Sequence, residues 1–348
     1  MTPPLSANVN PNKINAGPLG DIYITGAVTG AAYIQNKESP VDRESRVDVT
    51  NAQFFIQKTD GPIQFFVQGG GYSIPVIGVP YARAEDTTKA TFGLIPQAFV
   101  KIVPSENFNI MVGKLPTLYG AEYTFTFQNM NINRGVLWNQ ENAVNKGVQV
   151  NYANGPLSIS AAVADGFYSD KYSWVTGLVA YAFDSNNILA ISGGANLSKT
   201  GRVSGATPLA QNNQDIINVI YTHTSGPLTL IPYFQYNRVP AIPSLGLPSK
   251  SSTTGFALLG KYTFSENFSL AARGEYINSK GKDVSLLYGP GSNAWTATVT
   301  PTWQMGTLFV RGELAYIKTS DITPGFAFGA NGDKKSQVRA MVETGILF

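Results

Sequence analysis

Long runs of alternating apolar and polar residues recur throughout the 348-residue chain, and they limit the possible folds more than any other feature. In the segment 292–304, SNAWTATVTPTWQ, every second residue from Trp295 to Trp303 is non-polar and the residues between them are threonines. A period of two indicates β-strands with one apolar face. The runs last about 10–14 residues, roughly twice an average strand, and a tilted strand needs about 9–11 residues to cross a bilayer. The alternation therefore predicts membrane-crossing strands.

Short turns and long connections alternate along the chain, and together they predict the number of strands. Turn-forming residues occur in seven places, for example Asn154-Gly155-Pro156 and Ser225-Gly226-Pro227. Eight longer connections lie between them, at 36–44, 75–88, 116–143, 168–171, 200–213, 239–251, 280–292 and 321–334. We expect sixteen strands, at 20–35, 45–59, 63–74, 89–103, 108–115, 144–153, 157–167, 172–183, 188–199, 214–224, 228–238, 252–264, 268–279, 293–304, 307–319 and 335–348.

An even number of long strands with short turns at one end and long loops at the other is typical of an outer-membrane barrel. The barrel must close, because an open sheet edge in hydrocarbon leaves backbone groups without partners. A soluble β-propeller is the alternative, but it needs shorter strands and a blade repeat of about 40–50 residues, which we do not find. We therefore predict an all-β protein, a transmembrane antiparallel barrel of about 16 strands formed by residues 19–348, preceded by a periplasmic segment, 1–18.

The composition excludes several other classes of protein. Charged residues make up 14% of the chain, against roughly 25% in soluble domains. No apolar run approaches the ~18 residues of a spanning helix. Cysteine is absent, which excludes disulfides and a thiolate metal site. The net charge of only +3 is too weak to suggest a nucleic-acid partner. We expect no metal and no cofactor. The opening residues, MTPPLSANVNPNKINAGP, have neither a basic start nor an apolar core, so we expect no signal peptide in this chain.

Charged residues within the predicted strands lie mainly on the polar face. In a sixteen-stranded barrel that face is expected to meet water in the lumen. The charges then either neutralise one another or form a charged strip along a pore. The candidates are Lys101, Lys261, Arg273, Glu275, Arg311, Glu313, Arg339 and Glu343. On the opposite face, parity predicts lipid contacts for Leu230, Phe234, Trp295, Val299, Val342 and Ile346.

Three segments and the chain end carry a resemblance to known proteins. The segments are GKLPTLYGAEY (113–123), NMNINRGVLWNQENAVNKGVQVNY (129–152) and ADGFYSD (164–170), and the chain ends in GILF. This pattern resembles Gram-negative outer-membrane porins, in particular the OmpL-like β-barrel porin family. The resemblance implies an outer-membrane location, a passive channel for small hydrophilic solutes and a homotrimer. It also implies that the terminal Phe348 is part of the signal read by the outer-membrane insertion machinery.

The resemblance further implies that the longest loop, 116–143, folds into the lumen and narrows it. Glu122 and Glu141 would be its acids, facing Lys101, Arg273, Arg311 and Arg339 on the wall. Together with Arg134 and the other wall residues, six positive charges stand against five negative ones. Because the screening length is about 8 Å at physiological salt, we expect only a weak preference for anions.

Two other functions are alternatives to a diffusion channel. A purely structural barrel, adhesive or sheathing a partner protein, would not conduct ions. A barrel hydrolase would need a histidine beside a serine nucleophile. His223 is the only histidine and lies beside a predicted periplasmic turn, so we expect no enzyme.

Overall fold

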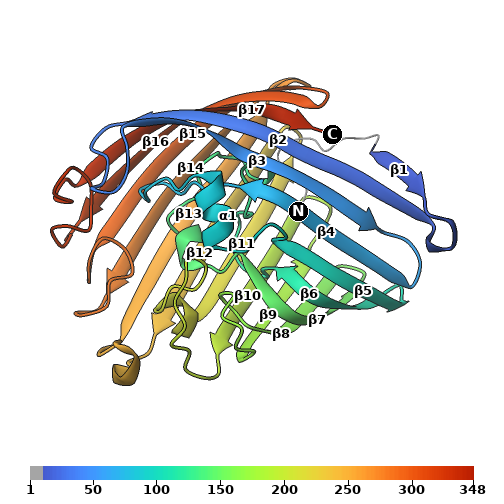
Figure 1. Cartoon of the computed structure of the whole chain (residues 1–348), viewed down its shortest axis with the longest axis horizontal. Helices are drawn as coiled ribbons and strands as arrows, with labels where there is room; N and C mark the ends of the chain where they lie inside the picture. Colours follow the sequence, from blue (N-terminus) through green and yellow to red (C-terminus); the bar gives the residue numbers. More distant parts are fainter. Residues whose placement is uncertain (1–10) are drawn as a thin grey trace.

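Within residues 11–348, which the computed structural model describes, sixteen long strands pair in chain order around a closed ring (Figure 1). The strands are β2 (Asp21–Gln35), β3 (Ser45–Lys58), β4 (Ile63–Tyr72), β5 (Gln97–Ser105), β6 (Phe108–Pro116), β7 (Val144–Asn154), β8 (Leu157–Ala164), β9 (Trp174–Ala182), β10 (Asn187–Asn196), β11 (Asp215–Ser225), β12 (Leu228–Val239), β13 (Ser251–Thr263), β14 (Phe268–Lys280), β15 (Asn293–Met305), β16 (Leu308–Ser320) and β17 (Ser336–Leu347).

The ring closes where the last strand pairs with the first. β17 runs antiparallel to β2, with Thr344 opposite Gly30 and Ile346 opposite Val28. The prediction of a sixteen-stranded antiparallel barrel is confirmed. A short additional strand, β1 (Asn12–Asn15), pairs with the beginning of β2. It belongs to the predicted N-terminal segment 1–18, of which residues 1–10 lie outside the described part of the chain.

Most strand ends lie within three residues of their predicted positions, and the clear exception is the predicted strand 89–103. The helix α1 (Ala84–Ala90) forms the end of the predicted connection 75–88 and includes the first two residues of this strand, and β5 begins only at Gln97. Acidic residues in the first turn suit the positive end of the helix dipole. Glu85 and Lys89 form an i,i+4 pair at 2.6 Å. These local signals favoured the helix over the strand at this point.

The outer surface carries the apolar face of the strands. Trp295 is 60% exposed and Val342 is 52% exposed, whereas the next residue on the inner face of β15, Thr296, is buried. Val299 and Ile346 are exposed on the same outer surface, and Leu230 and Phe234 lie there half-buried against outer neighbours such as Phe256. The predicted parity is confirmed. None of the helices in residues 11–348 is long and apolar enough to span a membrane.

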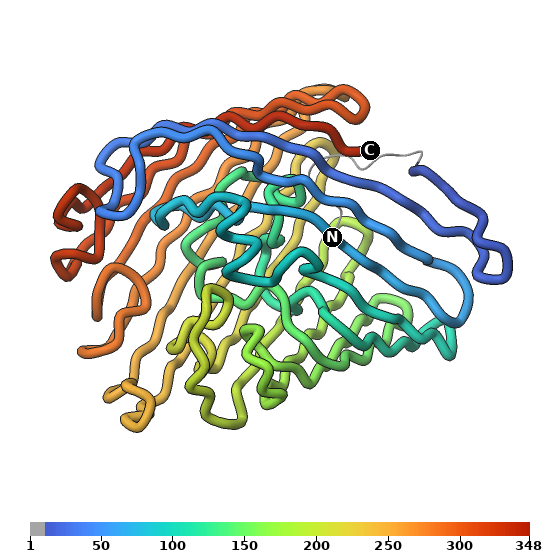
Figure 2. The backbone as a smooth tube through the Cα atoms, in the orientation of Figure 1, coloured from blue at the N-terminus to red at the C-terminus, as the bar shows by residue number. Residues whose placement is uncertain are grey.

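The buried core lies inside the barrel, not between two layers. Its largest cluster joins wall residues such as Ile231, Leu259 and Ile317 to Val136 and Leu137 of the longest loop. Figures 1 and 2 show α1 and this loop inside the ring of tilted strands. The loop is therefore packed into the barrel as a globular protein packs its core.

Phe348 closes the seam between β17 and β2 on the outer surface. Its backbone N–H donates to the Gly26 carbonyl at 3.0 Å, and the Gly26 N–H donates back at 2.7 Å. The aromatic ring lies directly over Gly26, where an added Cβ would be only 2.3 Å from a ring carbon. A ring covering a strand glycine shields backbone that would otherwise be bare.

We expect Gly26→Ala to displace the Phe348 ring and to lower the free energy of unfolding by about 1 kcal/mol through overpacking. Folding into lipid vesicles, followed by heat-modifiable migration on gels, measures the effect. Gly30→Ala on the same strand is the control, because an added Cβ there meets only a backbone oxygen at 3.6 Å. Equal losses in the two variants would contradict a specific role for the ring contact.

Candidate functional site

The loop between β6 and β7, residues 117–143, lies inside the barrel, and we call it the inner loop. It contains two short 3-10 turns, Thr126–Gln128 and Trp138–Gln140. The β4–β5 loop, residues 73–96, packs on it: the Arg134 N–H donates to the Pro75 carbonyl at 2.9 Å. The predicted folding of the longest loop into the lumen is confirmed.

Carboxylates on the barrel wall accept hydrogen bonds from the backbone of the inner loop. Glu313 on β16 accepts from the N–H groups of Ile132 and Asn133, at 2.5 and 3.0 Å. Glu275 on β14 accepts from the Val136 N–H at 3.2 Å. The wall acids thus satisfy donors that a loop without regular structure cannot pair within itself.

Guanidinium groups on the wall supply the complementary donors. Arg311 on β16 donates to the carbonyls of Asn129 and Thr126, at 2.9 and 2.7 Å. Arg273 on β14 donates to the Asn133 carbonyl at 2.8 Å. A planar guanidinium has five N–H donors, so one arginine can hold loop carbonyls and a carboxylate together.

The same wall charges also form buried ion pairs. Arg311 lies 2.5 Å from Glu343, with side-chain exposures of 1% and 0%. Arg273 lies 2.6 Å from Glu122 of the inner loop, with exposures of 0% and 7%. The expectation that these charges face lumen water is therefore wrong, because the inner loop covers them. The wall residues buried in this way are Arg273, Glu275, Arg311, Glu313, Arg339 and Glu343.

Arg339 on β17 connects three parts of the chain. It donates to the Val76 and Val79 carbonyls of the β4–β5 loop, at 3.1 and 2.9 Å. It also donates to the Asn133 side-chain oxygen at 2.9 Å and lies 3.5 Å from Asp42. This arginine therefore holds the β4–β5 loop and the inner loop against the same region of the wall.

Arg134 was predicted as a positive charge near the pore, but it stabilises the inner loop from within. Its guanidinium donates to the carbonyls of Thr124 and Ile132, at 3.0 and 2.8 Å. It lies 6.0 Å from the centre of the Trp138 ring and is fully buried. Its hydrogen bonds therefore stabilise the conformation of the inner loop itself.

The two acids of the inner loop have different partners on the wall. Glu141 accepts hydrogen bonds from the side chains of Tyr233 and Gln235 on β12, whereas Glu122 pairs with Arg273. Burial raises the pKa of Glu141 well above its usual range. Burial also raises the pKa of Glu122, although Arg273 opposes the shift. The two loop acids therefore bind the wall in different ways, Glu122 through an ion pair and Glu141 through neutral donors.

Lys101 and Lys261 differ from the other predicted wall charges, because both are only half-buried. Lys101 on β5 lies opposite Gln64 of β4, and Lys261 on β13 lies opposite Thr229 of β12. Both lie in the half of the lumen nearer the short turns. Of the eight predicted wall charges, these two are the ones the inner loop leaves accessible.

Sequence reasoning missed several residues that build this region. The alternation did not single out three of them: Asn51 and Thr126 are uncharged, and Asp42 lies in the predicted connection 36–44. Thr126 donates to Glu343 at 2.5 Å and accepts from Asn51 at 2.6 Å. Only the position of the inner loop brings these side chains together.

A row of aromatic rings on the lumen side of β3–β5 was also missed. Phe66 stacks with Phe55 at 6.1 Å and with Phe99 at 5.5 Å between ring centres, and Phe55 meets Phe127 of the inner loop at 5.8 Å. Phe55 shares its face of β3 with Gln53, which is buried inside the barrel. A phenylalanine is compatible with either face of a strand, so the sequence did not show that this row faces the lumen.

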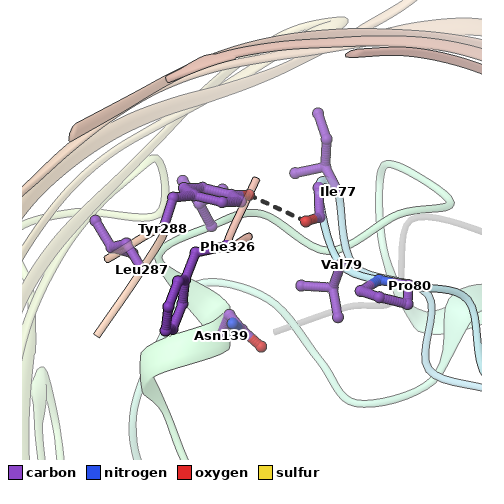
Figure 3. Close-up of a pocket in the computed structure, with 9 residues that line it drawn as sticks. Ile77, Val79, Pro80, Asn139, Leu287, Tyr288 and Phe326 are labelled. Carbon is purple, nitrogen blue, oxygen red and sulfur yellow. Dashed lines mark hydrogen bonds between the residues drawn. The ribbon is translucent and has the colours of Figure 1, made fainter. Parts of the chain in front are cut away.

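At the long-loop end, the loops enclose a small cavity of about 170 Å³. Figure 3 shows Tyr288 and Phe326 on one side of it and Val79 and Pro80 on the other. The Tyr288 hydroxyl donates to the Gly78 carbonyl at 3.1 Å. The loops are thus tied to one another across this end of the barrel.

A larger cavity of about 630 Å³ lies on the other side of the inner loop, toward the short turns. Its walls are β8–β13, and Ala121, Tyr123 and Met130 of the inner loop form its upper boundary. The inner loop is hydrogen-bonded mainly to β14–β17 and leaves this space beside the opposite strands.

The sequence profile of the family described as "Putative beta-barrel porin-2, OmpL-like" matches residues 21–348. The match begins at the first residue of β2 and ends at the last residue of the chain. The chain belongs to this family. No curated protein sequence matches it.

Solved porin structures resemble this porin in fold. An anion-selective porin from Comamonas acidovorans has a TM-score of 0.64 at 15% identity, covering 94% of this chain and 99% of that one. OmpT of Vibrio cholerae in its trimer form has a TM-score of 0.62 at 11% identity, covering 94% and 99%. The outer-membrane channel DcaP of Acinetobacter baumannii has a TM-score of 0.62 at 12% identity, covering 94% and 97%.

Family and fold together place this porin in the Gram-negative outer membrane, where the apolar outer surface of the barrel meets the bilayer. By the usual arrangement of such barrels, the short turns are periplasmic and the long loops extracellular. Membership of the family supports a porin role. His223 lies at the periplasmic end of β11, with Nδ1 2.8 Å from the Asn187 side-chain oxygen.

Proposed function

We propose that this porin is a passive diffusion channel for small hydrophilic solutes and ions, narrowed by the inner loop. The position of the inner loop carries the proposal. Wall charges hold the loop against β14–β17, and the cavity of about 630 Å³ remains between it and β8–β13. A loop fixed in this way sets the size of what passes, because its backbone is hydrogen-bonded to the wall.

We further propose that selectivity is weak and favours anions. The charges around the inner loop are buried and held in ion pairs or in hydrogen bonds, so they add little to the field in the open part of the lumen. Lys101 and Lys261 are accessible. No acid is among the described residues that line the cavity of about 630 Å³, which we call the periplasmic cavity. Two separated positive charges attract anions only modestly at physiological salt, where screening acts over about 8 Å.

A reversal-potential measurement across a KCl gradient tests this assignment. We expect a weak anion preference in the parent protein. The double variant Lys101→Glu plus Lys261→Glu is expected to prefer cations, because it changes the accessible charge from positive to negative. Lys37→Glu, at an exposed site beyond the end of β2, is the control and should leave the potential unchanged. A strong cation preference in the parent protein would refute the assignment.

The second candidate is a structural barrel without an open channel, adhesive or sheathing a partner. It is favoured by the apolar cluster inside the barrel, in which Ile77, Val136 and Phe328 are buried together. Single-channel recording separates the two functions: a diffusion channel conducts ions and a plugged scaffold does not.

The partners we propose are the outer-membrane lipid, the insertion machinery and two further copies of this chain. Phe348 completes an amphipathic last strand, which supports a role in insertion. The small residues Gly26, Gly30, Ala31 and Ala32 of the predicted strand 20–35 suggest flat packing between copies. Gly30 and Ala32 lie on the outer surface of β2 and support a homotrimer, whereas Phe348 covers Gly26 and Ala31 points into the lumen, where it is 7% exposed.

A further inference from the structure

The periplasmic cavity beside the inner loop is unusually apolar for the lumen of a water-filled channel. Five adjacent strands, β9–β13, place aliphatic side chains on its wall, where alternation would ordinarily place polar ones. These residues are Leu178, Ala180, Ala182, Ile188, Ala190, Ile220, Ile231 and Leu259. Met130 of the inner loop adds a flexible apolar side chain above them.

The part of this apolar surface on β9 and β10 is accessible within the lumen, because Leu178, Ala180, Ala182 and Ala190 are half-buried, whereas Ile220, Ile231 and Leu259 are buried at its edge. The pairing of the strands makes the surface continuous. Ile188 is 40% exposed although it faces inward. It lies opposite Ala182 of β9 on one side and Thr222 of β11 on the other, and both line the same cavity. Leaving this area in contact with water costs about 25 cal/mol per Å², so the wall favours any solute that covers it.

Polar groups gather at the periplasmic end of the same cavity. Lys261 is the single charged residue among the described residues that line it. The hydroxyl groups of Thr222, Thr224 and Thr229 lie on the neighbouring strands β11 and β12, and Lys261 lies directly opposite Thr229. One cation and several hydroxyls beside an aliphatic wall match a solute with an anionic end and an apolar body.

We propose that this cavity is a binding site for small amphipathic monoanions, such as alkyl carboxylates or sulfonates. The anionic group lies at Lys261 and the threonines, and the apolar body lies along β9–β12 under Met130. This inference rests on the proposed channel function and names a class of solute that the channel admits preferentially. A cavity of about 630 Å³ accommodates a chain of several methylene groups with room for water.

Hexane-1-sulfonate is a suitable probe because it stays ionised at any working pH, so it does not leak through the bilayer as a neutral acid. Its binding is measured by calorimetry on the protein in lipid nanodiscs, with empty nanodiscs subtracted. In planar bilayers, the same probe is added to the periplasmic side while the KCl current is recorded. We expect it to bind about tenfold more tightly than methanesulfonate and to reduce the current at lower concentration, because its methylenes cover the aliphatic wall.

Two variants separate the halves of the site. Lys261→Gln is expected to weaken hexanesulfonate binding about fivefold by removing the charged donor. Ala190→Asn is expected to remove most of the difference between hexanesulfonate and methanesulfonate, because it places a polar amide on the aliphatic wall. Lys37→Gln, at the exposed site beyond the end of β2 and outside the cavity lining, is the control and should leave binding unchanged.

The outcomes distinguish this inference from the proposed function. Equal binding of the two sulfonates by a conducting channel would overturn the site and leave the diffusion channel standing. A protein that binds hexanesulfonate but carries no current would overturn the channel and keep the site. Hexyltrimethylammonium binding as tightly as hexanesulfonate would overturn the role of Lys261.

Discussion

Replacing Arg311 with alanine is expected to loosen the inner loop and to destabilise the barrel by about 3–5 kcal/mol, the usual cost of leaving one member of a buried ion pair without its partner. Glu343 would remain buried with only hydroxyl donors, and the carbonyls of Asn129 and Thr126 would lose theirs. Urea unfolding in lipid vesicles measures the loss of stability. Single-channel recording should show a larger and noisier current.

The double variant Arg311→Met plus Glu343→Met separates the two effects. Replacing both members of a buried pair with apolar residues of similar size is often neutral for stability. We therefore expect near-normal unfolding but a current as noisy as that of Arg311→Ala, because the loop carbonyls still lack their donors. A quiet current of normal size in both variants would contradict the view that this arginine holds the inner loop.

Ile191→Arg on β10 is expected to destabilise the barrel by about 2–4 kcal/mol, the range for a basic residue on the lipid face near the bilayer midplane. Ile191 is 45% exposed on the outer surface, in the middle of its strand. Thr222→Arg on the adjacent strand is the control, because its side chain enters the periplasmic cavity and should cost less than about 1 kcal/mol. Similar losses in the two variants would refute the assignment of faces.

Val299 and Thr298 on β15, which the alternation places on opposite faces, are a poorer pair for this test. Thr298 faces the lumen as predicted, but it is only 4% exposed and lies 3.3 Å from the Arg273 guanidinium. An arginine there would be buried beside another cation. A mild loss of stability is expected only where a site faces open lumen, so Thr298→Arg is not expected to be mild.

For the wall charges, the predicted face of the strand is correct, but the predicted exposure to lumen water is wrong. Alternation placed Arg273, Glu275, Arg311 and Glu313 on the inner face, and they lie there. The resemblance implied that the loop acids Glu122 and Glu141 face wall bases across the lumen. Instead, wall residues of both signs bind the backbone of the inner loop. Backbone groups have no identity in the sequence, so no pattern of side chains announces that they will need partners inside the barrel.

Three features of the barrel could be predicted from the sequence: the number of strands, the alternation of short turns and long loops, and the face that each strand turns outward. These follow from local periodicity, because a bilayer demands one apolar face on every strand and closure of every edge. Three other features depend on contacts between distant segments: which charges bind the inner loop, where β5 begins after α1, and how aliphatic residues of β9–β13 surround a cavity. The physical reason is that the inside of a wide barrel is not one uniform environment. An inward-facing residue is buried where a loop packs on it and is in contact with water where no loop does.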